Sequence, residues 1–183
     1  MKHKQKGFTI VELLIVIVVI GILAAITVVA FNGIQQRANN TAIITSVNQS
    51  IKALSSYISV NDSYPATSSF CLVASSTCTA GGNAVTVNQT ALDKIKNIAN
   101  LPTSIPDARP EYNGIVYSYS SGRTFNGRNQ PLVLLYSLTG EAQSCGVANT
   151  TNSGGTVMTS GEYAVSSGGY TVCVVSIQGP AHG

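Results

Sequence analysis

Glu12 is a carboxylate at the start of a long apolar run, in the stretch "KGFTIVELLIVIVVIGILAAIT" that covers residues 6–27. An ionised side chain in apolar surroundings is unfavourable unless an opposite charge pairs with it. The run from Leu13 to Phe31 contains no charged residue and offers no such pairing. The position of Glu12 therefore indicates a partner that comes from elsewhere.

Cysteines are the second group with defined chemistry. All four follow the apolar run: Cys71, Cys78, Cys145 and Cys173. An even number of cysteines in a chain that is exported indicates disulfide bonds. Three connectivities are open, and pairing near neighbours in the sequence favours Cys71–Cys78 and Cys145–Cys173. Four buried free thiols are the alternative.

Patterns for a metal site or an enzyme are absent from the sequence. There is no CxxC, and the two histidines, His3 and His182, lie at the ends of the chain. HExxH, a phosphate-binding loop and a Ser–His–Asp set are also missing. The carboxylates beyond the apolar run are scattered: Asp62, Asp93, Asp107, Glu111, Glu141 and Glu162. We therefore predict no enzyme activity, no metal and no cofactor.

Positive charge is concentrated at the N-terminus. The chain of 183 residues has a formal net charge of +3, and without Lys2, Lys4 and Lys6 its basic and acidic residues are equal in number. Such a balance excludes a globally electrostatic nucleic-acid binder. Arg123 and Arg128, in the loop "SSGRTFNGRNQ", could contact DNA or an acidic polysaccharide. Two arginines are a small electrostatic footprint, so a solvated loop is favoured.

The apolar run is long enough to cross a membrane. As a helix, Leu13 to Phe31 measures about 28 Å, against about 30 Å for a hydrocarbon core. The lysines before it place the N-terminus in the cytoplasm and the remainder outside. A secretory signal peptide is disfavoured by the length of the run and by Glu12. A simple anchor explains the length and orientation but leaves Glu12 without a partner.

Residues 6–14, Lys-Gly-Phe-Thr-Ile-Val-Glu-Leu-Leu, resemble the class III signal of type IV pilins and pilin-like proteins. The resemblance covers residues 4–38 and is looser afterwards. It implies that a membrane peptidase cuts after Gly7, that the new N-terminal residue Phe8 is methylated, and that the apolar helix is retained. In this family the residue corresponding to Glu12 acts in assembly. The amine of Phe8 on another subunit would then be its partner, which turns two isolated charges into a pair.

One long helix is predicted from Phe8 to near Val60. Beyond the apolar run, a stripe with helical spacing predicts the face that packs on a head domain: Ile44, Val47, Ile51, Leu54 and Ile58. The other side of the helix is expected to carry Asn40, Asn48, Gln49 and Lys52. The turn-forming segment "NDSYP", residues 61–65, ends the helix.

The head is predicted to combine a short helix with a few strands. The helix covers Thr90 to Asn100, capped by Asn88 or Thr90. Strands are expected at 114–120, 131–138 and 170–177. The fold class is α+β, with a long N-terminal helix against an antiparallel sheet of three or four strands. We predict a cleaved leader (1–7), a transmembrane or filament-core helix (8–31), its amphipathic continuation (32–60) and a globular head (61–183).

These features favour a structural subunit of a type IV pilus-like filament that serves adhesion, twitching motility or DNA uptake. A pseudopilin of a type II secretion-like system and a membrane-anchored binding protein that never polymerises are the alternatives. The resemblance implies several partners: other copies of the chain, a prepilin peptidase and methyltransferase, an assembly platform with ATPases, and membrane lipid before assembly. It also implies a single-pass cytoplasmic-membrane protein that becomes part of an extracellular pilus.

Overall fold

The computed structural model describes residues 7, 9–73, 78–106, 108, 113–125, 128–147, 150–151, 157–158 and 165–180. The chain divides into two compact units, residues 1–38 and 39–183, and we describe each by itself. The predicted leader residues 1–6 and the predicted new N-terminal residue, Phe8, lie outside the described residues.

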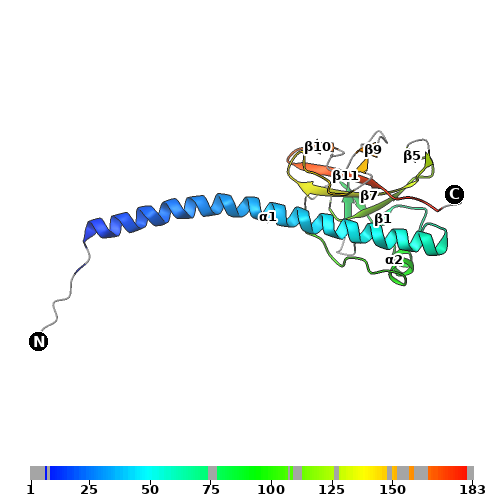
Figure 1. Cartoon of the computed structure of the whole chain (residues 1–183), viewed down its shortest axis with the longest axis horizontal. Coiled ribbons are helices and arrows are strands. Elements are labelled where there is room, and N and C mark those ends of the chain that lie inside the picture. The colour runs from blue at the N-terminus through cyan, green and yellow to red at the C-terminus, as the bar shows by residue number, and fades with distance from the viewer. Residues whose placement is uncertain are drawn as a thin grey trace, which may run out of the picture. The chain divides into compact units, whose positions relative to one another are not determined.

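Helix α1, Ile10–Asn61, is the longest element and is drawn in blue to cyan in Figure 1. The prediction of one continuous helix ending near Val60 is confirmed. The helix ends because Asp62 takes a left-handed conformation, with φ 48°, and donates its N–H to the Ile58 carbonyl oxygen at 2.8 Å. Aspartate tolerates this conformation better than most residues, and a left-handed residue just after the last turn is a common helix end.

The part of α1 that belongs to the second unit buries one face. Val47, Leu54 and Ile58 are buried, and Ile44 and Ile51 pack against the same core, so the predicted stripe is confirmed. Ile43 and Tyr57 widen the buried face. The prediction for Asn40 is wrong: this side chain was expected on the outer side of the helix, but its residue is only 7% exposed.

Asn40 is buried because it pairs with the end of a strand. Its Nδ2 donates to the carbonyl oxygen of Thr139 at 2.9 Å, and its Oδ1 accepts from the Thr139 N–H at 3.0 Å. Thr139 is the last residue of strand β7, Leu132–Thr139. The carboxamide thus donates to one backbone group of Thr139 and accepts from the other, which joins the helix to the end of the strand.

The main sheet is antiparallel and contains more strands than the sequence predicted. Its order is β1-β4-β7-β11-β8-β9, with β10 also pairing with β11. The bounds are β1 Phe70–Cys71, β4 Val116–Tyr119, β8 Thr150–Thr151, β9 Val157–Met158, β10 Val165–Ser167 and β11 Tyr170–Ser176. The predicted count of three or four is wrong: the three predicted strands correspond to β4, β7 and β11, and the others span only two or three residues. Such short strands leave no period-two pattern in a sequence.

Two further two-stranded sheets lie outside the main one. They pair β2, Cys78–Ala80, with β3, Asn83–Val85, and β5, Thr124–Phe125, with β6, Arg128–Asn129. The β5–β6 pair lies within the segment between β4 and β7, which the sequence predicted to be a loop.

The short helix α2 covers Gln89–Lys96, so it ends earlier than the predicted Asn100. Asn88 caps its start, because the Asn88 Oδ1 accepts from the Ala91 N–H at 3.0 Å. Leu92 and Ile95 are buried and belong to the same core as α1.

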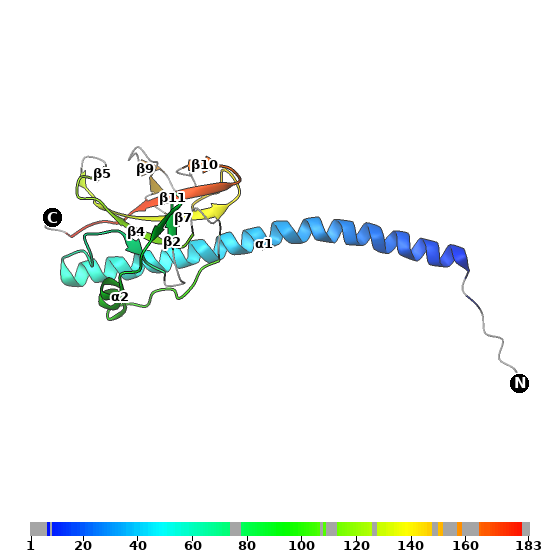
Figure 2. The ribbon, with the colours of Figure 1, turned by 180° about the vertical axis from the view of Figure 1, so that it is seen from behind.

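The core of the second unit lies between α1 and the sheet. Figures 1 and 2 show the later part of α1 running along one face of the sheet. Phe70 of β1 stacks on Tyr117 of β4, with ring centroids 4.4 Å apart. The hydroxyl of Tyr117 donates to the Ala66 carbonyl oxygen at 2.7 Å, which satisfies its polar end. The α+β architecture predicted from the sequence is confirmed.

Candidate assembly site

Thr9 and Glu12 form the first turn of α1 as a reciprocal cap. The Glu12 N–H donates to Thr9 Oγ1 at 3.3 Å, and Glu12 Oε2 accepts from the Thr9 N–H at 2.8 Å and from the Thr9 hydroxyl at 2.7 Å. Threonine at the cap and glutamate three residues later is the pattern of a capping box. The pair satisfies backbone donors that the helix start leaves unpaired.

This geometry corrects the sequence-based view of Glu12. A simple anchor was expected to leave the carboxylate without a partner, but Thr9 of the same chain is one. The sequence carries the signal for this cap as "TIVE", residues 9–12, in which threonine precedes glutamate by three positions. Because hydroxyl and amide groups are neutral, Thr9 leaves the negative charge of Glu12 uncompensated. The carboxylate side chain remains exposed and open to a cation.

Gly7, the residue before the predicted cleavage point, is exposed. A methyl group added at its Cα would meet no atom within 4 Å. The space beside the Gly7 Cα is therefore open to another protein.

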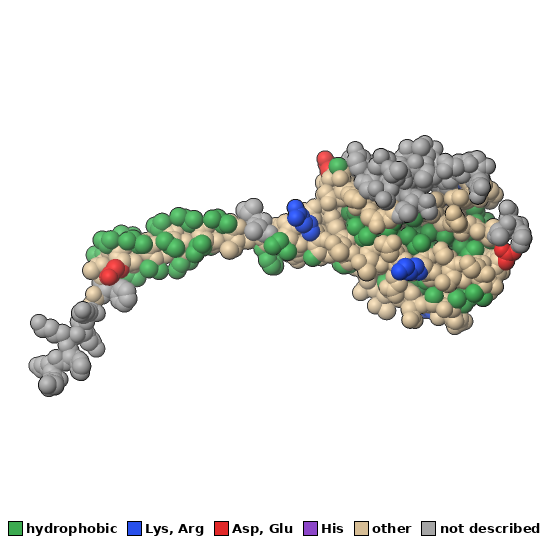
Figure 3. Space-filling model, viewed as in Figure 1, with side chains coloured by type: hydrophobic (Ala, Val, Ile, Leu, Met, Phe, Trp, Pro, Cys, Tyr) green, Lys and Arg blue, Asp and Glu red, His purple; other side chains and the backbone are tan. Residues whose placement is uncertain are grey.

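The apolar side chains of the first unit form an uncovered surface around α1 (Figure 3). Exposed fractions of its large aliphatic residues run from 48% at Val19 to 78% at Ile10. The helix is long and apolar enough to cross a membrane, by length and composition. A continuous apolar surface of this kind marks contact with a membrane or with other protein.

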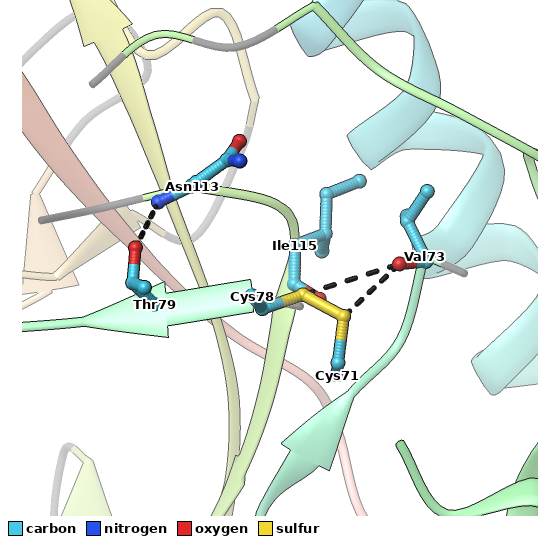
Figure 4. The surroundings of a disulfide bond; sticks show 6 residues. All are labelled: Cys71, Val73, Cys78, Thr79, Asn113 and Ile115. Atoms are coloured by element: carbon cyan, nitrogen blue, oxygen red, sulfur yellow. Dashed lines mark hydrogen bonds between the residues drawn. A yellow bond between two sulfur atoms is a disulfide. The ribbon is translucent and has the colours of Figure 1, made fainter. Parts of the chain in front are cut away.

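The structure joins Cys71 at the end of β1 to Cys78 at the start of β2, with Cα atoms 5.4 Å apart (Figure 4). The Val73 carbonyl oxygen lies 3.0 Å from Cys71 Sγ. Gly114 also approaches this disulfide, because a Cβ at that position would collide with Cys78 Sγ. Beside the disulfide, Thr79 and Asn113 are paired: the Thr79 N–H donates to the Asn113 carbonyl oxygen at 3.0 Å, and Thr79 Oγ1 accepts from the Asn113 N–H at 2.9 Å.

Cys145 is joined to Cys173, with Cα atoms 5.8 Å apart. Cys173 lies in the middle of β11, and Cys145 lies in the loop after β7. Both are fully buried. The buried hydroxyl of Tyr136, on β7, donates to the Cys145 carbonyl oxygen at 2.7 Å. The loop after β7 is therefore held to the sheet by one covalent bond and one hydrogen bond.

Arg123 is not the solvated loop side chain that was expected. Its Nη1 donates to the carbonyl oxygens of Ser118 at 3.1 Å and Pro131 at 2.9 Å, so it bridges the ends of β4 and β7. Partial burial lowers the pKa of its guanidinium from the usual value. These contacts direct the charge toward the backbone of the head. The side chain of Arg128 lies outside the described residues.

Among the described residues, no group of three or more His, Cys, Asp or Glu side chains could hold a metal ion. His182, Asp107, Glu111 and Glu162 lie outside that part of the chain.

Comparison with known proteins identifies the family to which this chain is similar. A model of the prokaryotic N-terminal methylation motif matches residues 2–28. The type IV wide pilus major component PilA4 of Thermus thermophilus is 31% identical over 127 residues, which cover 60% of this chain and 97% of the relative. This chain belongs to the type IV pilin family. The resemblance carried by residues 4–38 is thereby confirmed.

Other relatives of this pilin match over shorter stretches. The type II secretion system core protein G of Escherichia coli is 36% identical over 64 residues, 35% of this chain and 44% of the relative. A fimbrial protein of Neisseria meningitidis is 36% identical over 77 residues, 42% of this chain and 45% of the relative. The pilin thus matches less than half the length of these two proteins. No solved structure matches it.

Proposed function

We propose that this pilin is a structural subunit of an extracellular type IV pilus-like filament. The carrying observation is the extent of the match to the Thermus wide pilus component, which spans 97% of that relative. The matches to type II secretion core protein G stop after 64 to 66 residues. Similarity that spans almost a whole pilus component favours a pilus over a pseudopilus, the alternative function.

Maturation in this proposal begins at Gly7. A prepilin peptidase cuts after Gly7, and a methyltransferase modifies the new N-terminal residue, Phe8. The methylation motif over residues 2–28 and the open surroundings of Gly7 support this step. Residues 1–7 are lost, and α1 remains attached to the head.

Before assembly, the apolar part of α1 spans the cytoplasmic membrane, with the N-terminus in the cytoplasm and the head outside. Lipid covers the exposed aliphatic side chains at this stage. In the filament, α1 helices of neighbouring subunits cover them instead. Extraction from the membrane requires work, which a membrane assembly platform with ATPases supplies.

Glu12 provides the register between subunits. The Phe8 amine of one subunit meets the carboxylate of Glu12 on another, and the two charges neutralise each other within the apolar core. Thr9 keeps the Glu12 carboxylate at the helix start but leaves its charge for this partner. Adhesion, twitching motility and DNA uptake are the roles open to such a filament. We do not assign DNA or acidic polysaccharide to Arg123, because its guanidinium donates to Ser118 and Pro131.

The test compares cells with and without this chain. Deleting it should remove filaments from electron micrographs, and an antibody to the head should decorate filaments along their length in complemented cells. Intact mass of the filament subunit should show loss of residues 1–7 plus one methyl group. Normal filaments in the deletion strain, with loss of protein secretion instead, would favour a pseudopilin. A membrane-bound mature chain that never enters filaments would favour the anchored binding protein.

A further inference from the structure

A cleft of about 890 Å³ opens in the second unit where several segments end. It lies between the last turn of α1, the end of β4, the base of the β5–β6 hairpin and the segment after β11. Figures 1 and 2 both show the end of α1, the β5 hairpin and the C-terminal segment at the same end of the head. Its volume lies in the range typical of small-molecule sites, about 300 to 1,000 Å³.

Two tyrosines supply the aromatic part of the cleft. Tyr64 and Tyr119 meet edge to face, with ring centroids 5.4 Å apart and planes at 69°. Gly179 lies close to the Tyr64 hydroxyl, because a methyl group at Gly179 would collide with it. Burial raises the pKa of Tyr64 above 10.0, so its hydroxyl stays a neutral donor at physiological pH.

Polar side chains from separate segments complete the lining: Ser59, Asp62, Asn129, Gln130 and Gln178. Within the described part of the chain, none of these five side chains makes a hydrogen bond to another group. Each carboxamide carries two donors and an acceptor, and the Asp62 carboxylate carries acceptors only. The cleft therefore offers several unused donors and acceptors beside aromatic surface.

The charges of the side chains that line the cleft indicate which class of ligand it can bind. Among the described residues that line the cleft there is no lysine or arginine, so they offer none of the cations that bind the phosphates of a nucleic acid or the carboxylates of an acidic glycan. Asp62 would repel such polyanions. A purely apolar ligand would leave the carboxamides and the carboxylate unpaired. A pyranose ring meets both requirements, because its hydroxyls pair with carboxamides and carboxylates while its C–H face rests on an aromatic ring.

We propose that this cleft binds a neutral saccharide, with Tyr64 and Tyr119 as its stacking surface and Asp62, Asn129, Gln130 and Gln178 as hydroxyl partners. The site is open, so a single cleft binds weakly. A filament would repeat the cleft once per subunit, and a polysaccharide that contacts many of these weak sites at once would bind more tightly. Only that last step rests on the proposed function, since binding to one subunit does not need a filament.

The test uses the full processed chain in a detergent without a sugar headgroup, since alkyl glycosides would occupy the site. Cellotetraose, maltotetraose and a β-galactotetraose are the neutral probes, and tetragalacturonate is the acidic one. Saturation-transfer NMR and titration should detect at least one neutral probe, and tetragalacturonate should not bind. Tyr119→Ala and Gln178→Ala should each weaken binding at least about tenfold. Gln89→Ala removes an exposed carboxamide of α2 that bonds to Asp93 and does not line the cleft, so it should leave sugar binding unchanged.

Gly179→Ala extends the test, because it displaces Tyr64 without removing any lining side chain. We expect it to weaken binding as strongly as Tyr119→Ala, with unchanged near-ultraviolet circular dichroism outside the tyrosine signal. Absence of binding by all three neutral probes, or preference for tetragalacturonate, would overturn the proposal. Equal binding by Gln178→Ala and the native chain would place the sugar elsewhere. If the cleft variants lose filaments and the native chain binds no sugar, the cleft is a contact between subunits.

Discussion

Asn40 is the clearest case of one side chain that holds two distant parts of the head together. Its carboxamide makes two hydrogen bonds to the backbone of Thr139, across a separation of 99 residues in the sequence. Asn48 makes a superficially similar contact, but its Nδ2 only donates to the Ile44 carbonyl oxygen within α1. Asn40 therefore joins α1 to the sheet, whereas the contact of Asn48 stays within the helix.

Asn40→Ala should lower the free energy of unfolding by about 2 to 4 kcal/mol, because the N–H and the carbonyl oxygen of Thr139 both lose their hydrogen bonds to this side chain. Urea unfolding of the full chain in detergent, followed by tyrosine circular dichroism, measures the change. Asn48→Ala is the matched control, and a change within about 0.5 kcal/mol is expected. A similar loss for both variants would show that the contact with Thr139 adds nothing specific.

The buried hydroxyl of Tyr136 makes the stability of the head depend on pH in the alkaline range. Burial raises the pKa of its hydroxyl far above the ordinary 10.0, and it also raises the pKa of Tyr117. An acid with a higher pKa in the folded chain holds its proton more tightly there, so the stabilisation is complete below pH 10 and is lost as the pH rises above it. The free energy of unfolding should therefore fall steeply above pH 10.

Tyr136→Phe should cost about 1 kcal/mol at pH 7, because the hydrogen bond to Cys145 is lost. It should also flatten the decline between pH 10 and pH 11, since the residue can no longer ionise in the unfolded chain. Replacing Tyr117 by Phe as well should flatten it further. Urea unfolding at a series of pH values tests this, and an unchanged alkaline slope in the double variant would refute the role of the two tyrosines.

At the scale of elements, β11 is the strand that unites the sheet. It pairs with β7 over seven residues and also contacts β8 and β10. Cys173 lies in its centre, so the bond to Cys145 ties the loop after β7 to the most connected strand. The bond between Cys71 and Cys78 closes a shorter loop beside β1.

Replacing Cys145 and Cys173 together by Ser should destabilise the head by about 3 to 4 kcal/mol, as expected for closing a loop of 28 residues. The pair Cys71 and Cys78, separated by seven residues, should matter less, by about 2 to 3 kcal/mol. Peptide mapping of filaments without reduction gives the connectivity directly. A peptide containing Cys71 joined to Cys173 would require a different arrangement of the sheet edge.

Elements with a strong local pattern were predictable from the sequence, and contacts between distant segments were not. The stripe from Ile44 to Ile58 has the helical period, and β4, β7 and β11 are long enough to show strand signals. The two-residue strands carry no period, so the size of the sheet was underestimated. The burial of Asn40 depends on Thr139, and the role of Arg123 depends on Pro131. The Thr9–Glu12 cap is different, because its local pattern was visible and was overlooked.

For the whole molecule, the exposed apolar part of α1 is a large unsatisfied surface, and Glu12 is its one acidic group. The aliphatic side chains attract neighbouring α1 helices to one another but do not fix how far one helix is shifted along the next, because one apolar contact resembles another. A charge that needs a specific partner supplies the register. The capping box adds a second role for the same carboxylate, since Glu12 also stabilises the start of the helix. Separating these two roles is the decisive test of assembly.

Glu12→Gln separates the two roles, because a glutamine at this position still forms the reciprocal cap with Thr9 but carries no charge. If neutralising the Phe8 amine is essential, this variant should insert in the membrane and fold its head normally, and sheared surface filaments should fall at least about tenfold. Glu12→Leu, which loses both cap and charge, should fall to a similar level. Quantitative immunoblots of membrane and sheared fractions, from cells that lack the native copy, give the measurement.

Thr9→Val is the matched control for that experiment, since it removes the hydroxyl of the capping box and leaves the charge of Glu12. The Glu12 carboxylate can still accept from the Thr9-position N–H, so the helix start is weakened and not lost. We expect filament yield within about twofold of the native chain, because the pairing with the Phe8 amine persists. Normal yield from Glu12→Gln, with loss in Thr9→Val and Glu12→Leu, would reverse the conclusion. Glu12 would then serve the helix start, and the register between subunits would come from the packing of the aliphatic side chains alone.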